Sequence, residues 1–125
     1  MLKKFRNLKI SIHIPLYVDF KKKQQLKNFR KACKSFLKIS NRAKIFVHTN
    51  KKFKGDKKIK YFYYDFNKIK EHPYKLTWFC RKIMEKQKNM FDVFIYSEDK
   101  ILFTKKNFRY WLDHKDLCIK NDYNL

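Results

Sequence analysis

Two adjacent carboxylates, Glu98 and Asp99, are the residues whose types and position most suggest chemistry. They follow the apolar run at residues 93–96 and precede a second apolar run at 101–103. Acids are scarce in this chain, which has 11 Asp and Glu against 33 Lys and Arg. Neighbouring carboxylates repel each other, and a divalent cation such as Mg²⁺ or Mn²⁺ would relieve that repulsion. Such an ion, commonly completed by substrate phosphates, would neutralise a diphosphate leaving group.

A simpler interpretation of the same residues stays open. The sequence Ser-Glu-Asp-Lys at residues 97–100 is also a reasonable solvated turn after a strand, in which Lys100 pairs with one of the acids. On spacing alone, the turn is the slightly better interpretation.

Strands and helices alternate around these acids. Apolar patterns predict strands at residues 8–17, 43–48, 59–64 and 91–96, and the first of them stops at Pro15. Helical spacing predicts helices at residues 21–38, 74–88 and, as a short segment, 107–113. The order predicts one α/β domain over residues 1–125, with a Rossmann-like, mostly parallel sheet flanked by helices. Ligands of such sheets bind outside the carboxyl ends of the strands, where both acids are expected.

The composition excludes several classes of site. A single glycine, Gly55, cannot supply a glycine-rich phosphate loop. The net charge of +22 comes mostly from Lys spread along the chain, and a bias towards A/T-rich codons accounts for it together with the many Asn, Ile, Phe and Tyr residues. We therefore expect a solvated basic surface, and a nucleic-acid partner is disfavoured. No apolar run reaches the roughly 18 residues of a membrane span.

The histidines and cysteines do not form a recognisable metal motif. Three cysteines lie far apart without a CxxC pair, which argues against a zinc site and against a disulfide framework. Reduced thiols in the cytoplasm are the simplest interpretation. His114 and Cys118 are four residues apart, but two ligands do not make a metal site. We expect His13 to be a core or face residue of its strand, and Trp78 to pack in the core.

Three stretches of the chain carry a family resemblance. They are ISIHIPLYV at residues 10–18, HPYKLTWFCR at 72–81 and FIYSEDKILFTKKNFRYW at 94–111. In this order and spacing they resemble the nucleotide-sugar-binding half of glycosyltransferases with the GT-A fold. The first is similar to the opening strand of that fold, and the third to its metal-binding strand. Lys100 stands where this branch usually carries a further acid.

The resemblance implies an enzyme that transfers a sugar from a nucleoside diphosphate donor to an acceptor hydroxyl of a glycan or lipid-linked molecule. It implies that Pro15 and Tyr17 line the base and ribose pocket, and that Glu98 and Asp99 hold Mn²⁺ or Mg²⁺ on the diphosphate. Arg81 would reach a phosphate. The catalytic residue is unknown, and 125 residues are expected to be an incomplete glycosyltransferase domain.

Two alternatives stay open. A small basic α/β module could hold nucleic acid through Lys and exposed aromatic residues, and a truncated remnant could keep the fold without the activity. The expected location is the cytoplasm, and peripheral contact with the inner face of a membrane is left open. The sequence does not specify the sugar, the nucleotide, the acceptor or the stereochemical outcome.

Overall fold

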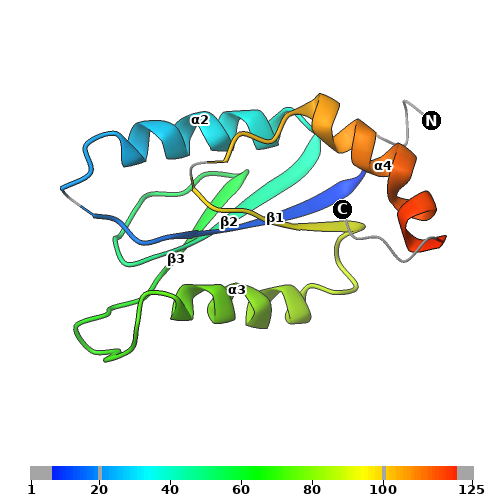
Figure 1. The fold of residues 1–125 in the computed structure, drawn as a ribbon. Coiled ribbons are helices and arrows are strands. Elements are labelled where there is room, and N and C mark those ends of the chain that lie inside the picture. Colours follow the sequence, from blue (N-terminus) through cyan, green and yellow to red (C-terminus); the bar gives the residue numbers. More distant parts are fainter. Residues whose placement is uncertain (1–6, 20, 100, 121–125) are drawn as a thin grey trace.

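A computed structural model describes residues 7–19, 21–99 and 101–120, with side chains described as far as His114. The described part of the chain forms a four-stranded sheet with helices on both faces (Figure 1). In chain order the elements are β1 (Lys9–Leu16), α2 (Gln25–Leu37), β2 (Arg42–Thr49), β3 (Ile59–Tyr63), α3 (Lys75–Lys86), β4 (Val93–Tyr96) and α4 (Lys105–Lys120). The predicted α/β class is confirmed.

The sheet is parallel throughout, with the strand order β3-β2-β1-β4. The chain leaves β1 through α2 to reach β2 on one side, and it returns through α3 to place β4 on the other side of β1. α2 and α4 cover one face of the sheet, and α3 covers the opposite face (Figure 1). β1 and β4 therefore flank the point at which the strand order reverses, where open α/β sheets bind their ligands.

Aliphatic side chains fill the space between the sheet and α2. Alternate residues of β1 point to this face and are fully buried: Ile10, Ile12, Ile14 and Leu16. They pack in one cluster with Phe29 and Phe36 of α2, residues of β2, and Phe108 of α4. Each fully buried aliphatic side chain of this size contributes about 1.5–3 kcal/mol to folding.

The opposite face carries polar and aromatic side chains. Ser11, His13 and His48 are fully buried beneath α3, whose buried residues are Leu76 and Cys80. Trp78 was expected in the core and is instead 56% exposed. The helical stripe that meets the sheet runs through Leu76 and Cys80, and Trp78 lies between these positions on the solvent side.

α4 is longer than the predicted segment at residues 107–113. Thr104 and Asn107 cap its beginning reciprocally: the Asn107 backbone N–H donates to Thr104 Oγ1 at 3.2 Å, and the Thr104 backbone N–H donates to Asn107 Oδ1 at 3.0 Å. This arrangement is a capping box with Asn in the third helical position. None of the described helices combines the length and the apolar character needed to cross a membrane.

Pro15 lies inside β1, which continues to Leu16, although the strand was expected to stop at the proline. A proline inside a sheet removes a backbone donor. The His13 carbonyl accepts from the Ser97 backbone N–H at 3.0 Å, so the main chain of His13 faces β4. Pro15, two residues later, faces the same side. The β1–β4 pairing ends at His13 with Tyr96, so the proline is accommodated beyond the ladder.

Candidate functional site

A cavity of about 410 Å³ opens at the carboxyl ends of β1 and β4. One wall is the segment that enters α2, and the other is the segment that follows β4. The lining residues are Lys22, Lys23, Gln24, Gln25, Asn28, Glu98 and Asp99. Both predicted metal ligands thus lie in a cavity at the point where the strand order reverses.

Gln25 ties the two walls of this cavity together. Its Nε2 donates to the Tyr17 carbonyl at 2.8 Å and to Asp99 Oδ2 at 3.2 Å. Its Oε1 accepts from the Asp19 backbone N–H at 2.9 Å. One half-buried amide therefore fixes the segment after β1 against the carboxylate after β4. The sequence analysis did not single out Gln25, and the available signal was only a polar residue in the first turn of the helix that follows β1.

The beginning of α2 makes one wall of the cavity attractive to anions. The N-cap residue, Gln24, makes no side-chain capping hydrogen bond, and the first turn contains no acid. An uncapped helix N-terminus presents backbone N–H groups and a partial positive charge. Lys22 and Lys23 line the same wall and are exposed. A phosphate group placed here would meet both kinds of positive charge.

The two acids on the other wall fit a hard divalent cation. Glu98 is exposed and Asp99 is half-buried, so both carboxylates can reach the cavity. Among the described side chains, ion pairs within 4.0 Å are those of Glu71 and Glu85 with lysines of α3 and its flank, and neither involves these two acids. Carboxylate oxygens beside an open volume suit Mg²⁺ or Mn²⁺, which keep several waters and share substrate phosphates. Lys100 lies outside the described residues.

The other predicted ligand contacts are placed differently. Pro15 is half-buried within β1, and Tyr17 is 42% exposed just beyond it, with its ring edge-on to Phe66 at 5.5 Å. The backbone carbonyl of Tyr17 is bonded to the cavity residue Gln25, but the Tyr17 side chain is not among the residues that line the cavity. Arg81 is exposed on α3, where its guanidinium stacks on Trp78 at 5.2 Å. The structure does not bring Arg81 to the cavity.

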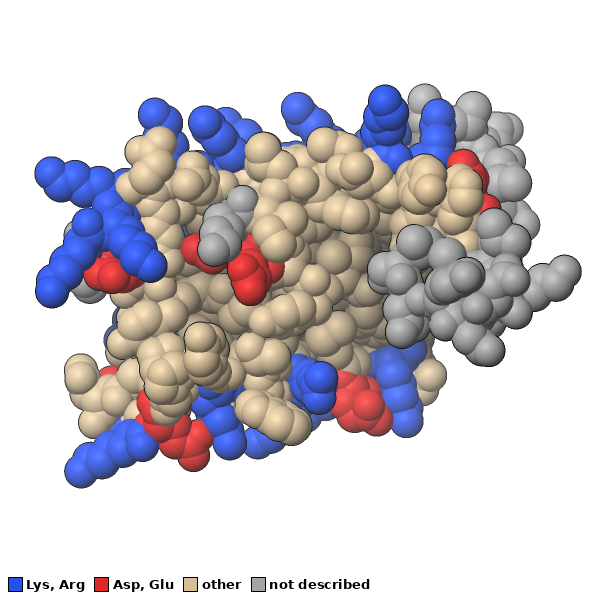
Figure 2. All heavy atoms as spheres, viewed as in Figure 1, with Lys and Arg blue, Asp and Glu red and all other residues tan. Residues whose placement is uncertain are grey.

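Positive charge on the visible face lies along its edges. In Figure 2, Lys and Arg side chains gather along the α2 edge, along the α3 edge and at the end of the molecule where α2 begins, and the strip between them is mostly uncharged apart from a group of acidic side chains. Positive charge on this side is therefore spread around the edges rather than concentrated in one block.

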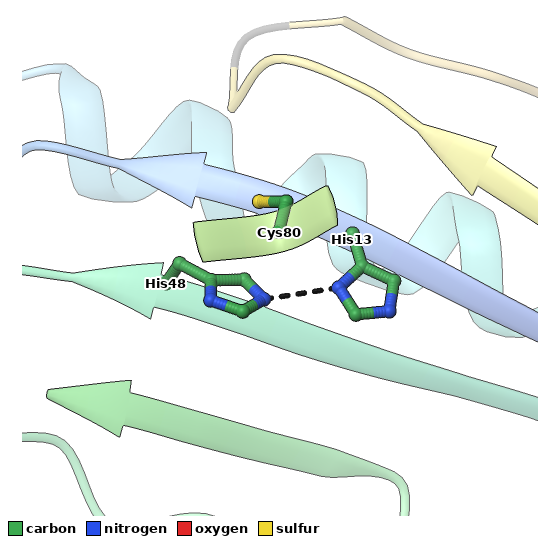
Figure 3. Close-up of side chains that lie close together, drawn as sticks. All are labelled: His13, His48 and Cys80. Carbon is green, nitrogen blue, oxygen red and sulfur yellow. Dashed lines mark hydrogen bonds between the residues drawn. The ribbon is translucent and has the colours of Figure 1, made fainter. Parts of the chain in front are cut away.

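A second group of chemically active side chains lies under α3. His13 and His48 project from β1 and β2 towards Cys80 of α3 (Figure 3). One ligand atom from each of the three residues lies within 4.8 Å of the other two, and all three residues are fully buried. The closest pair is His13 Nδ1 and His48 Nε2, at 2.9 Å.

Hydrogen bonds continue outward from both histidines. The Ser11 hydroxyl donates to Gln87 Oε1 at 2.7 Å, and His13 Nε2 lies 3.0 Å from the same oxygen. His48 Nδ1 lies 3.0 Å from the Tyr64 hydroxyl. Because Gln87 Oε1 can only accept, His13 carries its proton on Nε2 and accepts at Nδ1. His48 then donates from Nε2 and accepts the Tyr64 hydroxyl proton at Nδ1.

Burial keeps the titratable side chains of this hydrogen-bonded cluster neutral. Burial, together with a smaller electrostatic contribution from the neighbouring His13, lowers the pKa of His48 to about 3. Burial also lowers the pKa of His13, partly offset by the hydrogen bond to Gln87. Burial raises the pKa of the Tyr64 hydroxyl and of the Cys80 thiol, each to about 12. The protonation states required by the hydrogen bonds and those favoured by burial agree.

This cluster was missed by the sequence analysis, which looked for local spacing. His13 and His48 are 35 residues apart and meet only because β1 pairs with β2 in the observed register. Cys80 joins them because it lies on the buried stripe of α3. The sequence offered one weak signal: His13 lies between two isoleucines of a predicted strand, and His48 follows the apolar residues of another.

Comparison of this chain with protein-family models, with curated proteins and with solved structures found no match.

Proposed function

We propose that this chain binds a nucleoside diphosphate sugar together with Mn²⁺ or Mg²⁺, as the donor-binding part of a glycosyltransferase. The observation that carries the proposal is the cavity at the carboxyl ends of β1 and β4. It sets two carboxylates opposite an uncapped helix N-terminus with two lysines. A diphosphate with its cation needs carboxylates to hold the cation and positive groups to bind the phosphate oxygens.

Each wall has a distinct role in the proposed complex. Glu98 and Asp99 hold the cation, and the bound ion offsets the charge that develops on the leaving diphosphate. Lys22, Lys23 and the first turn of α2 bind the phosphate oxygens. Tyr17, whose side chain is 42% exposed just beyond the carboxyl end of β1, would offer its ring to the base. Gln25 keeps Asp99 in place and positions the segment that carries Tyr17.

Calorimetric titration of the full chain with UDP and GDP, with and without Mn²⁺, tests the proposal. Near-physiological salt is needed because a strongly basic protein binds polyanions non-specifically in dilute buffer. We expect binding that requires the metal and falls at least about tenfold in Asp99→Asn, corresponding to about 1.4 kcal/mol. Asp113→Asn is the matched control: it makes the same charge change at an exposed position of α4, outside the cavity.

Equal, metal-independent binding by the Asp99→Asn variant would contradict the proposal and leave residues 97–100 as a turn. A single-stranded oligonucleotide serves as the competing ligand in the same assay. Steeply salt-dependent binding of the oligonucleotide, unaffected by Asp99→Asn and without nucleotide binding, would favour the nucleic-acid module instead.

A further inference from the structure

We propose that His13, His48 and Cys80 form a buried site for a zinc-type transition-metal ion, distinct from the hard-cation site at Glu98 and Asp99. The three side chains come from β1, β2 and α3, so the ion would join the central strands to the helix that covers them. This inference does not depend on the proposed function.

The spacing of the ligand atoms is close to that of a tetrahedral zinc site. Bonds of about 2.1 Å to nitrogen and 2.3 Å to sulfur place the two nitrogens about 3.4 Å apart and each nitrogen about 3.6 Å from the sulfur. The observed separation of His13 Nδ1 from His48 Nε2 is 2.9 Å, and one ligand atom from each of the three residues lies within 4.8 Å of the other two. Coordination therefore requires the two nitrogens to separate by about 0.5 Å and the sulfur to approach them by at most about 1.2 Å.

The outer hydrogen bond of His13 already has the form found in metal sites, and that of His48 acquires this form once its proton moves to Nδ1. Ligating histidines usually donate their second ring N–H to an oxygen, which fixes the ring orientation. Gln87 Oε1 lies 3.0 Å from His13 Nε2, and the Tyr64 hydroxyl lies 3.0 Å from His48 Nδ1. The ion would replace the proton between the two imidazoles, and the partners on their outer sides would stay in place.

The protons can be followed through the binding step. Cys80 loses its thiol proton, which leaves the protein, and the thiolate electron pair forms the bond to the metal. The His48 proton moves from Nε2 to Nδ1, where it is donated to the Tyr64 oxygen. His13 keeps its proton on Nε2 and coordinates through Nδ1. One proton is released per ion, and the ion with its thiolate carries a net charge of +1.

The donor set selects the class of metal. Two imidazole nitrogens and one thiolate suit Zn²⁺, Co²⁺ and copper, whereas Mg²⁺ and Mn²⁺ prefer oxygen. Three protein ligands leave a fourth position for water or another small donor.

The test is a titration of the full-length, reduced protein with Co²⁺, followed by absorbance. We expect thiolate-to-cobalt absorption that saturates at one equivalent, release of one proton per ion, and displacement by one equivalent of Zn²⁺. Cys33→Ala/Cys118→Ala leaves Cys80 as the sole thiol without altering the cluster, and it should keep the absorption. Cys80→Ala should lose it.

The possible results distinguish cobalt binding at Cys80 from binding at either of the other two cysteines. No thiolate absorption in the wild type, or none in Cys33→Ala/Cys118→Ala, overturns the proposal. Absorption lost in Cys118→Ala but kept in Cys80→Ala also overturns it, because the ion would then use Cys118. Should Cys80→Ala fail to fold, the double variant still decides the question, since its only thiol is the one in the cluster.

Discussion

The two faces of the sheet are stabilised by different interactions, apolar packing on one and hydrogen bonds on the other. On the α2 face, β1 contributes four fully buried aliphatic residues to a cluster that includes Phe36 and Phe108. On the α3 face, the same strand contributes Ser11 and His13 to a series of hydrogen bonds that runs from Ser11 through Gln87 and the two histidines to Tyr64. Apolar packing has no preferred direction, whereas each hydrogen bond requires a specific partner. The first face therefore supplies most of the stability, and the second fixes one arrangement of β1, β2 and α3.

Truncation of the aliphatic face gives the largest expected effect. Phe36 is fully buried and stacks on Phe103 with 5.9 Å between ring centroids. Phe36→Ala should lower the free energy of unfolding by about 3–5 kcal/mol, because it removes a large side chain and leaves a cavity. Urea denaturation measures the loss. Trp78→Ala, at an exposed position, is the control, and a comparable loss there would contradict the assignment of the main core to the α2 face.

A double-mutant cycle on the polar face should give a smaller but non-additive effect. His48→Phe leaves His13 Nδ1 and the Tyr64 hydroxyl without their partner, at a cost of about 1–3 kcal/mol for each buried group. In His13→Phe/His48→Phe the bond between the imidazoles is lost from both sides. The double variant should therefore be more stable than the sum of the single effects predicts, by about 0.5–3 kcal/mol. Additive effects in chemical denaturation would mean that the two imidazoles are not coupled.

Alkaline pH should lower the stability of the fold through the thiol of Cys33, which is buried on the α2 face. Burial raises the pKa of Cys33 to about 12 from an unfolded value of 9.0. A raised pKa means that the folded state holds its proton more tightly, so this contribution is complete below pH 9 and declines as the pH rises towards 12. At pH 10 the loss is about 1.4 kcal/mol. Relative to pH 8, wild type should lose more stability at pH 10 than Cys33→Ala does, as measured by denaturation. Equal losses would contradict the shift.

The sequence predicted the aliphatic face better than the polar one. The alternation of isoleucines in β1 and the apolar stripe of α2 specify element type and inward direction without knowledge of the partner. The meeting of His13 with His48 depends on the pairing register of two strands, which no local pattern contains. Gln25 acts as a bridge only through the positions of Tyr17 and Asp99, which are far apart in the sequence. The position of Glu98 and Asp99 at the carboxyl edge of the sheet was predictable, because the strand ends of a parallel sheet share one edge, whereas their role as metal ligands stays a prediction.

Pro15 has a consequence for the cavity that goes beyond strand geometry. If β4 continued along β1, the residue at position 15 would donate its N–H to the carbonyl of Ser97. The hydrogen-bonded pairing of the two strands would then extend towards Glu98 and Asp99. Proline has no hydrogen to donate, so the ladder stops at the Ser97 bond to His13. The chain after Ser97 is released from β1 and is held instead by the side chain of Gln25. The absence of a backbone N–H at Pro15 thus prevents further pairing of β1 with β4 and keeps the cavity at their carboxyl ends open.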